Sequence, residues 1–133
     1  RPILMVPKTF NRPEKILMAL DGSKTARKGV EMLARSPLFA GTECHVLIVG
    51  AETAERRSEL EWALGTLREA GHQAEGAIRA GEVDEALQAY ETENSIDLLV
   101  MGAYGHSRIR HLLVGSTTTA MLRGSRIPVL ILR

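Results

Sequence analysis

The chain has 133 residues, which is enough for one domain with a substantial core and too few for two. Hydrophobic residues make up 44% and charged residues 25%, ordinary values for a soluble globular protein that exclude a disordered chain. The 17 basic and 16 acidic residues give a net charge of +1, so no overall field attracts nucleic acid or an anionic membrane, and anion binding must be local.

The cysteine content and the apolar runs indicate the cellular compartment. The single cysteine, Cys44, cannot form an internal disulfide, which fits a reducing compartment. No apolar run approaches the ~20 residues needed to cross a bilayer. The apolar stretch Pro2 to Val6 lacks the length and the cleavage pattern of a signal peptide. We therefore expect a cytoplasmic protein without a membrane partner.

The chain begins with an apolar strand pattern, Arg1 to Pro7, that no helix precedes. This stretch is similar in character to the final one, Arg126 to Leu132, because arginine and proline lead an apolar run in both. One interpretation makes residues 1–14 the last strand and linker of a preceding copy of the domain, with residues 15–133 the second half of a tandem protein. The alternative is a chance similarity between two short strands.

The first strand and helix of the domain follow this segment. Ile16 to Leu20 is a continuous apolar run typical of a buried parallel strand, and the apolar residues from Ala26 to Leu33 recur at helical spacing. Ser23 is predicted to cap this helix. Asp21 comes at the carboxyl end of the strand, where open α/β sheets bind ligands. A simple turn or cap role for Asp21 is the alternative.

The middle of the chain continues the alternation of strands and helices. His45 to Val49 is predicted as the second strand, and Ala54 to Ala70 as the helix that follows it. Gln73 to Ala80 alternates weakly and contains a glycine, which suits an edge strand. A third helix is predicted between Glu82 and Ser95. The run Leu98 to Met101 then has the composition of a strand buried on both faces.

A glycine-rich loop follows this buried strand. The strand stops at Gly102, Gly105 comes after two residues, and Gly115 after nine more, before the hydroxyl residues Ser116 to Thr118 start a predicted helix. Glycines let the backbone pass close to a ligand, and a helix start presents free N–H groups to an anion. The alternative is that the glycines only make turns and the serine only caps. The complete order of features, with arginines inside the loop, favours a phosphate site.

The spacing G-x-x-G, nine residues, then G-[ST] resembles the nucleotide-binding signature of the universal stress protein family. It is neither the dinucleotide fingerprint nor the G-x-x-x-x-G-K-[ST] loop. The resemblance extends from Lys15 to Arg133. It implies a regulatory ATP-binding domain of the stress response.

The order of predicted elements specifies the fold class. Strict alternation of strands and helices implies an α/β protein with a parallel sheet and helices on both faces. Right-handed crossovers then give a doubly wound, five-stranded, Rossmann-like sheet. The resemblance implies the strand order 3-2-1-4-5 of adenine nucleotide alpha hydrolase-like folds. In that order Asp21 and the loop after Gly102 face one another across a single crevice.

The resemblance also implies which residues contact the nucleotide. The adenine and ribose pocket would be lined by Ala19, Asp21 and Val49. The ribose and phosphates would be contacted by Gly102, Ala103, Gly105, His106, Ser107 and Arg108. The phosphate tail would be held by Gly115, Ser116, Thr117 and Thr118. A Mg²⁺ ion would enter with the nucleotide, and Ser116 is the evident hydroxyl that could reach it.

The residues do not indicate catalytic machinery or a resident metal. Ser23 and Ser116 have no neighbouring histidine to activate them, and the four histidines lack the spacing of a zinc site. Two alternatives to the regulatory module remain open. One is a nucleotide hydrolase or nucleotidyl-transferring relative with the same crevice, and the other is a dimerisation scaffold that binds no nucleotide.

The last predicted strand, Ile127 to Leu132, is strongly apolar and ends the sheet in the expected order. An exposed apolar edge strand invites pairing with another chain. The resemblance implies a homodimer, or pairing with a second such domain, through this strand. We expect Val129 and Ile131, or their alternates Leu130 and Leu132, at the interface, with the strand Arg1 to Pro7 involved.

Overall fold

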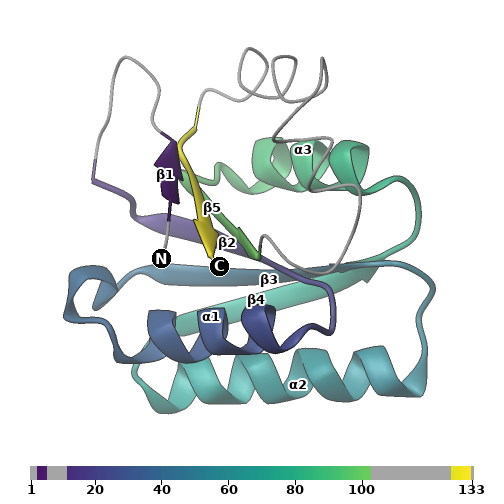
Figure 1. Cartoon of the computed structure of the whole chain (residues 1–133), viewed down its shortest axis with the longest axis horizontal. Helices are drawn as coiled ribbons and strands as arrows, with labels where there is room; N and C mark the ends of the chain where they lie inside the picture. Colours follow the sequence, from purple (N-terminus) through teal and green to yellow (C-terminus); the bar gives the residue numbers. More distant parts are fainter. Residues whose placement is uncertain (1–2, 6–11, 103–126, 133) are drawn as a thin grey trace.

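The computed structural model describes residues 3–5, 12–102 and 127–132 (Figure 1). The described elements, in chain order, are β1 (Ile3–Met5), β2 (Lys15–Leu20), α1 (Lys24–Arg35), a short 3-10 helix η1 (Pro37–Phe39), β3 (Glu43–Val49), α2 (Ala54–Glu69), β4 (Gln73–Arg79), α3 (Val83–Asn94), β5 (Leu98–Gly102) and β6 (Val129–Leu132). The helix predicted to start at Ser116 to Thr118 lies outside these residues.

The strands form one sheet in the order β1-β6-β5-β2-β3-β4. All neighbours from β6 to β4 are parallel. The predicted order 3-2-1-4-5 is therefore confirmed, because it corresponds to β4-β3-β2-β5-β6. The predicted edge position of β4 is confirmed as well.

The sheet differs from the expected five parallel strands by one addition. β1 pairs antiparallel with β6, and Leu4 lies opposite Leu130. The backbone groups on the outer side of β6, which a five-stranded sheet would leave unpaired, are thus paired within the same chain.

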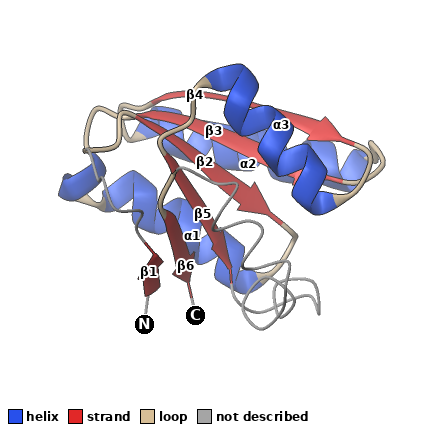
Figure 2. Ribbon diagram, turned by 90° about the horizontal axis from the view of Figure 1, so that it is seen from above, coloured by secondary structure: helices blue, strands red, loops and turns tan. Residues whose placement is uncertain are grey.

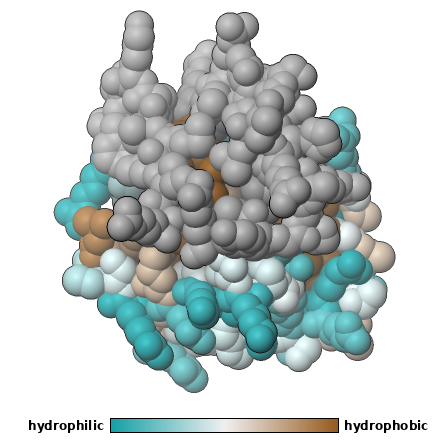
Figure 3. Space-filling model, viewed as in Figure 1, coloured by the Kyte–Doolittle hydropathy of each residue, from teal (hydrophilic) through white to brown (hydrophobic). Residues whose placement is uncertain are grey.

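Helices cover both faces of the sheet, with α1 and α2 on one face and α3 on the other (Figure 2). Successive residues of β2 serve the two faces in turn, since Ile16 and Met18 pack toward α1 and α2 while Leu17 packs toward α3. The outward side of α1 and α2 is mostly hydrophilic in Figure 3. Among the described helices, none is long and apolar enough to span a bilayer.

Local sequence explains where the helices begin. The predicted cap of α1 is present, because the Ser23 hydroxyl accepts the Ala26 N–H at 3.1 Å. Thr53 caps α2 in the same way through the Arg56 N–H. Gly29 lets α1 lie close to the sheet, because a Cβ there would lie 2.5 Å from Leu132 Cδ1.

The last strand begins two residues later than predicted. β6 runs from Val129 to Leu132, after Pro128, whose carbonyl accepts the Leu99 N–H at 3.1 Å. Proline has no N–H to donate, so it marks the beginning of the strand.

Candidate functional site

A cleft of about 980 Å³ opens at the carboxyl ends of β2, β3 and β5. It is the switch point of the sheet, because the chain leaves β2 toward β3 on one side and reaches β5 on the other. Its described lining comprises Ala19, Leu20, Asp21, Gly22, Leu47, Ile48, Val49, Thr53, Ala54, Glu55, Arg56, Glu59, Val83, Leu87, Met101 and Gly102.

One wall of the cleft is apolar. Leu47, Leu87 and Met101 belong to the cluster that packs between the sheet and α3, and Ala19 and Val49 border the same cluster. This wall provides the surface against which a flat hydrophobic group, such as a nucleobase, could pack.

Asp21 has two carboxylate oxygens with different environments. Its Oδ1 accepts the Ser23 N–H at 2.9 Å, as expected for a turn residue. Its Oδ2 is buried and has no hydrogen-bond partner among the described residues. A buried acceptor without a partner is costly, so this oxygen is suited to receive a donor from a ligand. Asp21 thus holds the turn and also offers a spare acceptor in the cleft.

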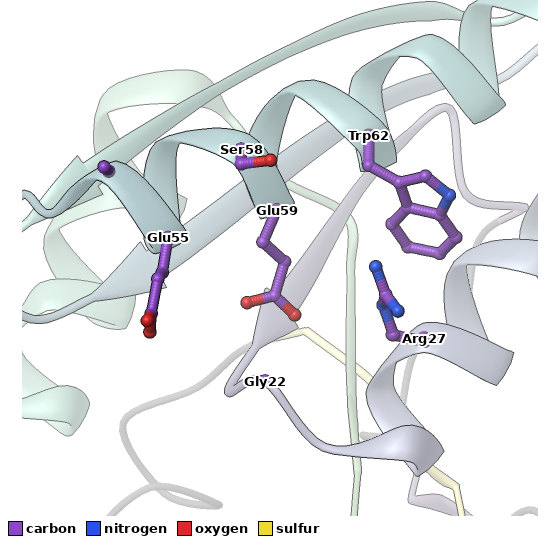
Figure 4. A pocket seen from close by; sticks show the side chains of 7 residues that line it. Gly22, Arg27, Glu55, Ser58, Glu59 and Trp62 are labelled. Carbon is purple, nitrogen blue, oxygen red and sulfur yellow. The ribbon is translucent and has the colours of Figure 1, made fainter.

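Glu59 on α2 was not indicated by the sequence. Its Oε1 is also buried without a partner in the described part of the chain. Its side chain points toward the Gly22 turn (Figure 4), where a Cβ would lie 3.7 Å from Glu59 Oε2. Nothing in the local pattern of α2 distinguishes Glu59 from the other acidic residues of the helix, so only the tertiary structure places it at the cleft.

A second hollow of about 670 Å³ adjoins the cleft between α1 and α2 (Figure 4). The two share Gly22, Ala54, Glu55 and Glu59. Farther along, the Arg27 guanidinium lies 4.5 Å from the centroid of the Trp62 ring, a cation–π contact that joins the two helices.

Arg56 is another cleft residue that the sequence did not indicate. Its Nη1 donates to the Ala51 carbonyl at 2.8 Å, and its guanidinium packs against Gly50. Arg56 sits in an ordinary charged stretch of α2, so the sequence did not single it out. The basic residues expected at the site were those of the glycine loop.

The structure brings together four of the predicted nucleotide contacts, namely Ala19, Asp21, Val49 and Gly102. The others lie outside the described residues and stay predictions: Ala103, Gly105, His106, Ser107, Arg108, Gly115, Ser116, Thr117 and Thr118. Gly102 packs against the start of α1, with Thr25 Cγ2 at 3.4 Å from the position of a Cβ.

A separate polar cluster lies near the amino ends of β3 and β4. Glu43, His45 and Glu75 offer oxygen or nitrogen atoms within 4.8 Å of one another, as metal ligands do. The spacing of residues along the sequence did not indicate this group, because strand pairing places Glu75 opposite His45.

Both ring nitrogens of the buried His45 already have partners. Nε2 lies 2.7 Å from Glu43 Oε2, and Nδ1 lies 2.7 Å from the Tyr90 hydroxyl. The hydrogen bond from His45 lowers the pKa of Glu43, while burial raises the pKa of Tyr90 to about 12. A neutral imidazole that donates to Glu43 and accepts from Tyr90 satisfies all three groups. A metal ion would have to displace one of these bonds, so we interpret the cluster as structural.

Comparisons with known proteins agree with this architecture. The chain matches the sequence model of the Universal stress protein family over residues 13–133. It is 42% identical to universal stress protein Slr1230 of Synechocystis sp. over 135 residues, which is 100% of this chain and 47% of that protein. The chain thus spans about half the length of this relative.

Solved structures share the fold at low identity. One is a universal stress protein in complex with cAMP, with a TM-score of 0.69, 21% identity, and coverage of 92% of this chain and 99% of the other. Another is a universal stress protein family protein from Arabidopsis thaliana with AMP bound, with a TM-score of 0.62, 16% identity, and coverage of 90% of each chain.

Proposed function

Because the chain belongs to the universal stress protein family, we propose that it is a regulatory domain that binds an adenine nucleotide, with ATP as the expected ligand, in the cleft at the ends of β2, β3 and β5. The relatives with bound cAMP and AMP carry ligands that share adenine and ribose. The proposal extends that shared chemistry to this chain.

The spare acceptor of Asp21 is the observation that carries the proposal. Asp21 lines the cleft, and its buried Oδ2 lacks a donor within the described structure. A ribose hydroxyl would supply that donor, and a charged acceptor makes such a bond strong. The adenine base would then lie against the apolar wall near Ala19 and Val49, and the phosphates would extend toward the loop that follows Gly102.

The remaining predicted contacts complete this arrangement. The phosphates would be held by the glycine loop and the helix start at Ser116 to Thr118, with Arg108 neutralising charge. A Mg²⁺ ion bound with ATP would supply further charge neutralisation, with the Ser116 hydroxyl as its protein ligand.

Isothermal titration with ATP, ADP and AMP, with and without Mg²⁺, tests the proposal. We expect saturable binding by the wild type, a loss of roughly tenfold or more in Asp21→Ala, and a smaller loss in Asp21→Asn, which keeps a neutral acceptor. Exposed Glu61→Gln on α2 serves as the control. The absence of binding by the wild type at millimolar nucleotide would contradict the proposal.

We also propose that β6 is the site of domain pairing. β1 pairs with the outer side of β6, and under the tandem interpretation residues 1–14 derive from a preceding domain. In a tandem protein or a homodimer, the corresponding strand of the second domain would take the place that β1 occupies.

A further inference from the structure

Arg56 is held in an unusual way at the end of β3. A Cβ built on Gly50 would lie 2.9 Å from Arg56 Cζ, 3.0 Å from Nε and 3.1 Å from Nη2. Since the central carbon is the nearest of the three atoms, the guanidinium turns a face, and not an edge, toward the Gly50 backbone. The bond from Nη1 to the Ala51 carbonyl fixes this orientation.

Gly50 makes this packing possible. Its φ of 152° lies in the region that L side chains rarely adopt, and any side chain would collide with the guanidinium. Its N–H donates to the Arg79 carbonyl at 2.8 Å, which anchors the turn to β4. The backbone is thus a fixed platform under one face of Arg56.

The charge of Arg56 is not neutralised within the described structure. No carboxylate of residues 12–102 or 127–132 lies within ion-pair distance of it, whereas the neighbouring Arg57 pairs with Glu52. The other described charged residues of the cleft, Asp21, Glu55 and Glu59, are acidic. Arg56 is therefore a preorganised planar cation that lines the cleft without an ionic partner there.

The position of Arg56 decides which part of a nucleotide it meets. It lies at the end of β3 beside Val49, while the glycine loop starts at Gly102 on β5, and β2 runs between these two strands. If the phosphates bind at the glycine loop, the base lies at the opposite end of the cleft, near Arg56. A guanidinium plane stacks readily on an aromatic ring, which a lysine ammonium cannot match.

We propose that Arg56 is a specificity-determining residue that stacks on the purine base, so that the base is held between this guanidinium and the apolar wall of the cleft. This inference rests on the proposed function, because it assigns a role within the same nucleotide site. The Arg56 guanidinium, held against the Gly50 backbone, then recognises the base and not the phosphates.

The test measures the dissociation constants of ATP and of inorganic tripolyphosphate, which has no base, for the wild type, Arg56→Ala, Arg56→Lys and the control Arg57→Ala. We expect Arg56→Ala and Arg56→Lys to weaken ATP binding by roughly tenfold, as loss of one stacked cation does. Tripolyphosphate binding should be unchanged in both, and Arg57→Ala should match the wild type. Thermal midpoints of all variants establish that each is folded.

Four results would overturn the inference. Full ATP affinity in Arg56→Lys would show that charge alone matters, and an equal loss for ATP and tripolyphosphate in Arg56→Ala would place Arg56 at the phosphates. Wild-type affinity in Arg56→Ala would remove its role altogether, although the proposed function would stand. A wild type that binds no ATP would instead remove the proposed function itself, and this inference with it.

Discussion

His45 on β3 and Tyr90 on α3 meet in a hydrogen bond of 2.7 Å, with their rings edge to face and the centroids 5.5 Å apart. Both residues are buried, at 1% and 4% exposure. This pair is a buried polar connection between α3 and the sheet, and Arg79 of β4 adds a more exposed one, an ion pair of 2.6 Å with Glu93. It aligns α3, whose Val83 and Leu87 form part of the cleft wall.

Tyr90→Phe tests this connection. The variant removes the hydrogen bond to the buried His45 Nδ1 and leaves that nitrogen with Glu75 Oε1 at 3.6 Å, so we expect the free energy of unfolding to fall by about 1–2 kcal/mol. Urea denaturation measures the change. In the double variant with His45→Leu, the further cost of losing the tyrosine hydroxyl should disappear, because no imidazole nitrogen is left without its hydrogen bond. An unchanged midpoint in Tyr90→Phe would contradict the assigned bond.

Glu91 on α3 makes stability depend on pH. Burial raises the pKa of its carboxyl from the usual 4.5 to about 7, and its Oε1 has no partner among the described residues. The folded state therefore binds a proton more tightly than the unfolded state. The stability that this tighter proton binding at Glu91 contributes is fully present below pH 4.5 and is lost as the pH rises through about 7.

Glu91→Gln should remove this loss, because the amide stays neutral at every pH. We expect the variant to exceed the wild type in stability above pH 7 by on the order of 2 kcal/mol, with the difference shrinking toward pH 4.5. Urea midpoints between pH 4 and 8 measure it. The exposed Glu85→Gln on the same helix is the control, and parallel pH curves for Glu91→Gln and the wild type would refute the expectation.

We predict that a glycine-to-alanine substitution has opposite effects on stability at Gly65 and at Gly29. Nothing lies within 4 Å of a Cβ at Gly65 of α2, so Gly65→Ala should stabilise the protein by about 0.5–1 kcal/mol through helix propensity. At Gly29 of α1 the Cβ would lie 2.5 Å from Leu132 Cδ1 and 2.7 Å from Met18 Cε. Leu132 and Met18 are buried and have little room to move away, so Gly29→Ala should destabilise by about 1–2 kcal/mol after the same gain in helix propensity is counted. Thermal or urea unfolding compares the two, and equal signs would contradict the packing at Gly29.

Removal of residues 1–7 tests the role of β1 at the β6 edge. The truncated chain exposes the outer side of β6, so we expect stronger self-association of the truncated chain than of the intact one. Light scattering at several concentrations measures the mass of both. A monomer at high micromolar concentration in both would rule out pairing through β6, and association only in the intact chain would indicate strand exchange.

The parallel, doubly wound α/β class could be predicted from local patterns and chain-wide rules, whereas the strand order was predicted from the family resemblance. Apolar runs such as Leu98–Met101 identify buried parallel strands, and crossover handedness then restricts how they are arranged. The antiparallel pairing of β1 had no such signal. A stretch of three paired residues has too little pattern to reveal its direction.

The part of the site that the resemblance implied and the structure brings together is the part that chain topology places at one sheet edge. Asp21 and Val49 end neighbouring parallel strands, so both had to lie at the same edge of the sheet. Arg56 and Glu59 come from the side of α2 that faces the cleft, and their polar neighbours along the helix look the same in sequence. Their selection depends on how α2 packs over the strand ends, which no local pattern encodes.

The contact between Arg27 and Trp62 gives the molecule a built-in optical probe. Trp62 is the single tryptophan of the chain, so its emission arises from one known place. Its ring lies in the hollow that shares Glu59 and Gly22 with the cleft, under a cation 4.5 Å away. The energy of the excited indole responds to nearby charge. Any ligand that shifts α1 relative to α2 thus changes the wavelength or intensity of the Trp62 fluorescence, so its binding can be followed without a label on the protein.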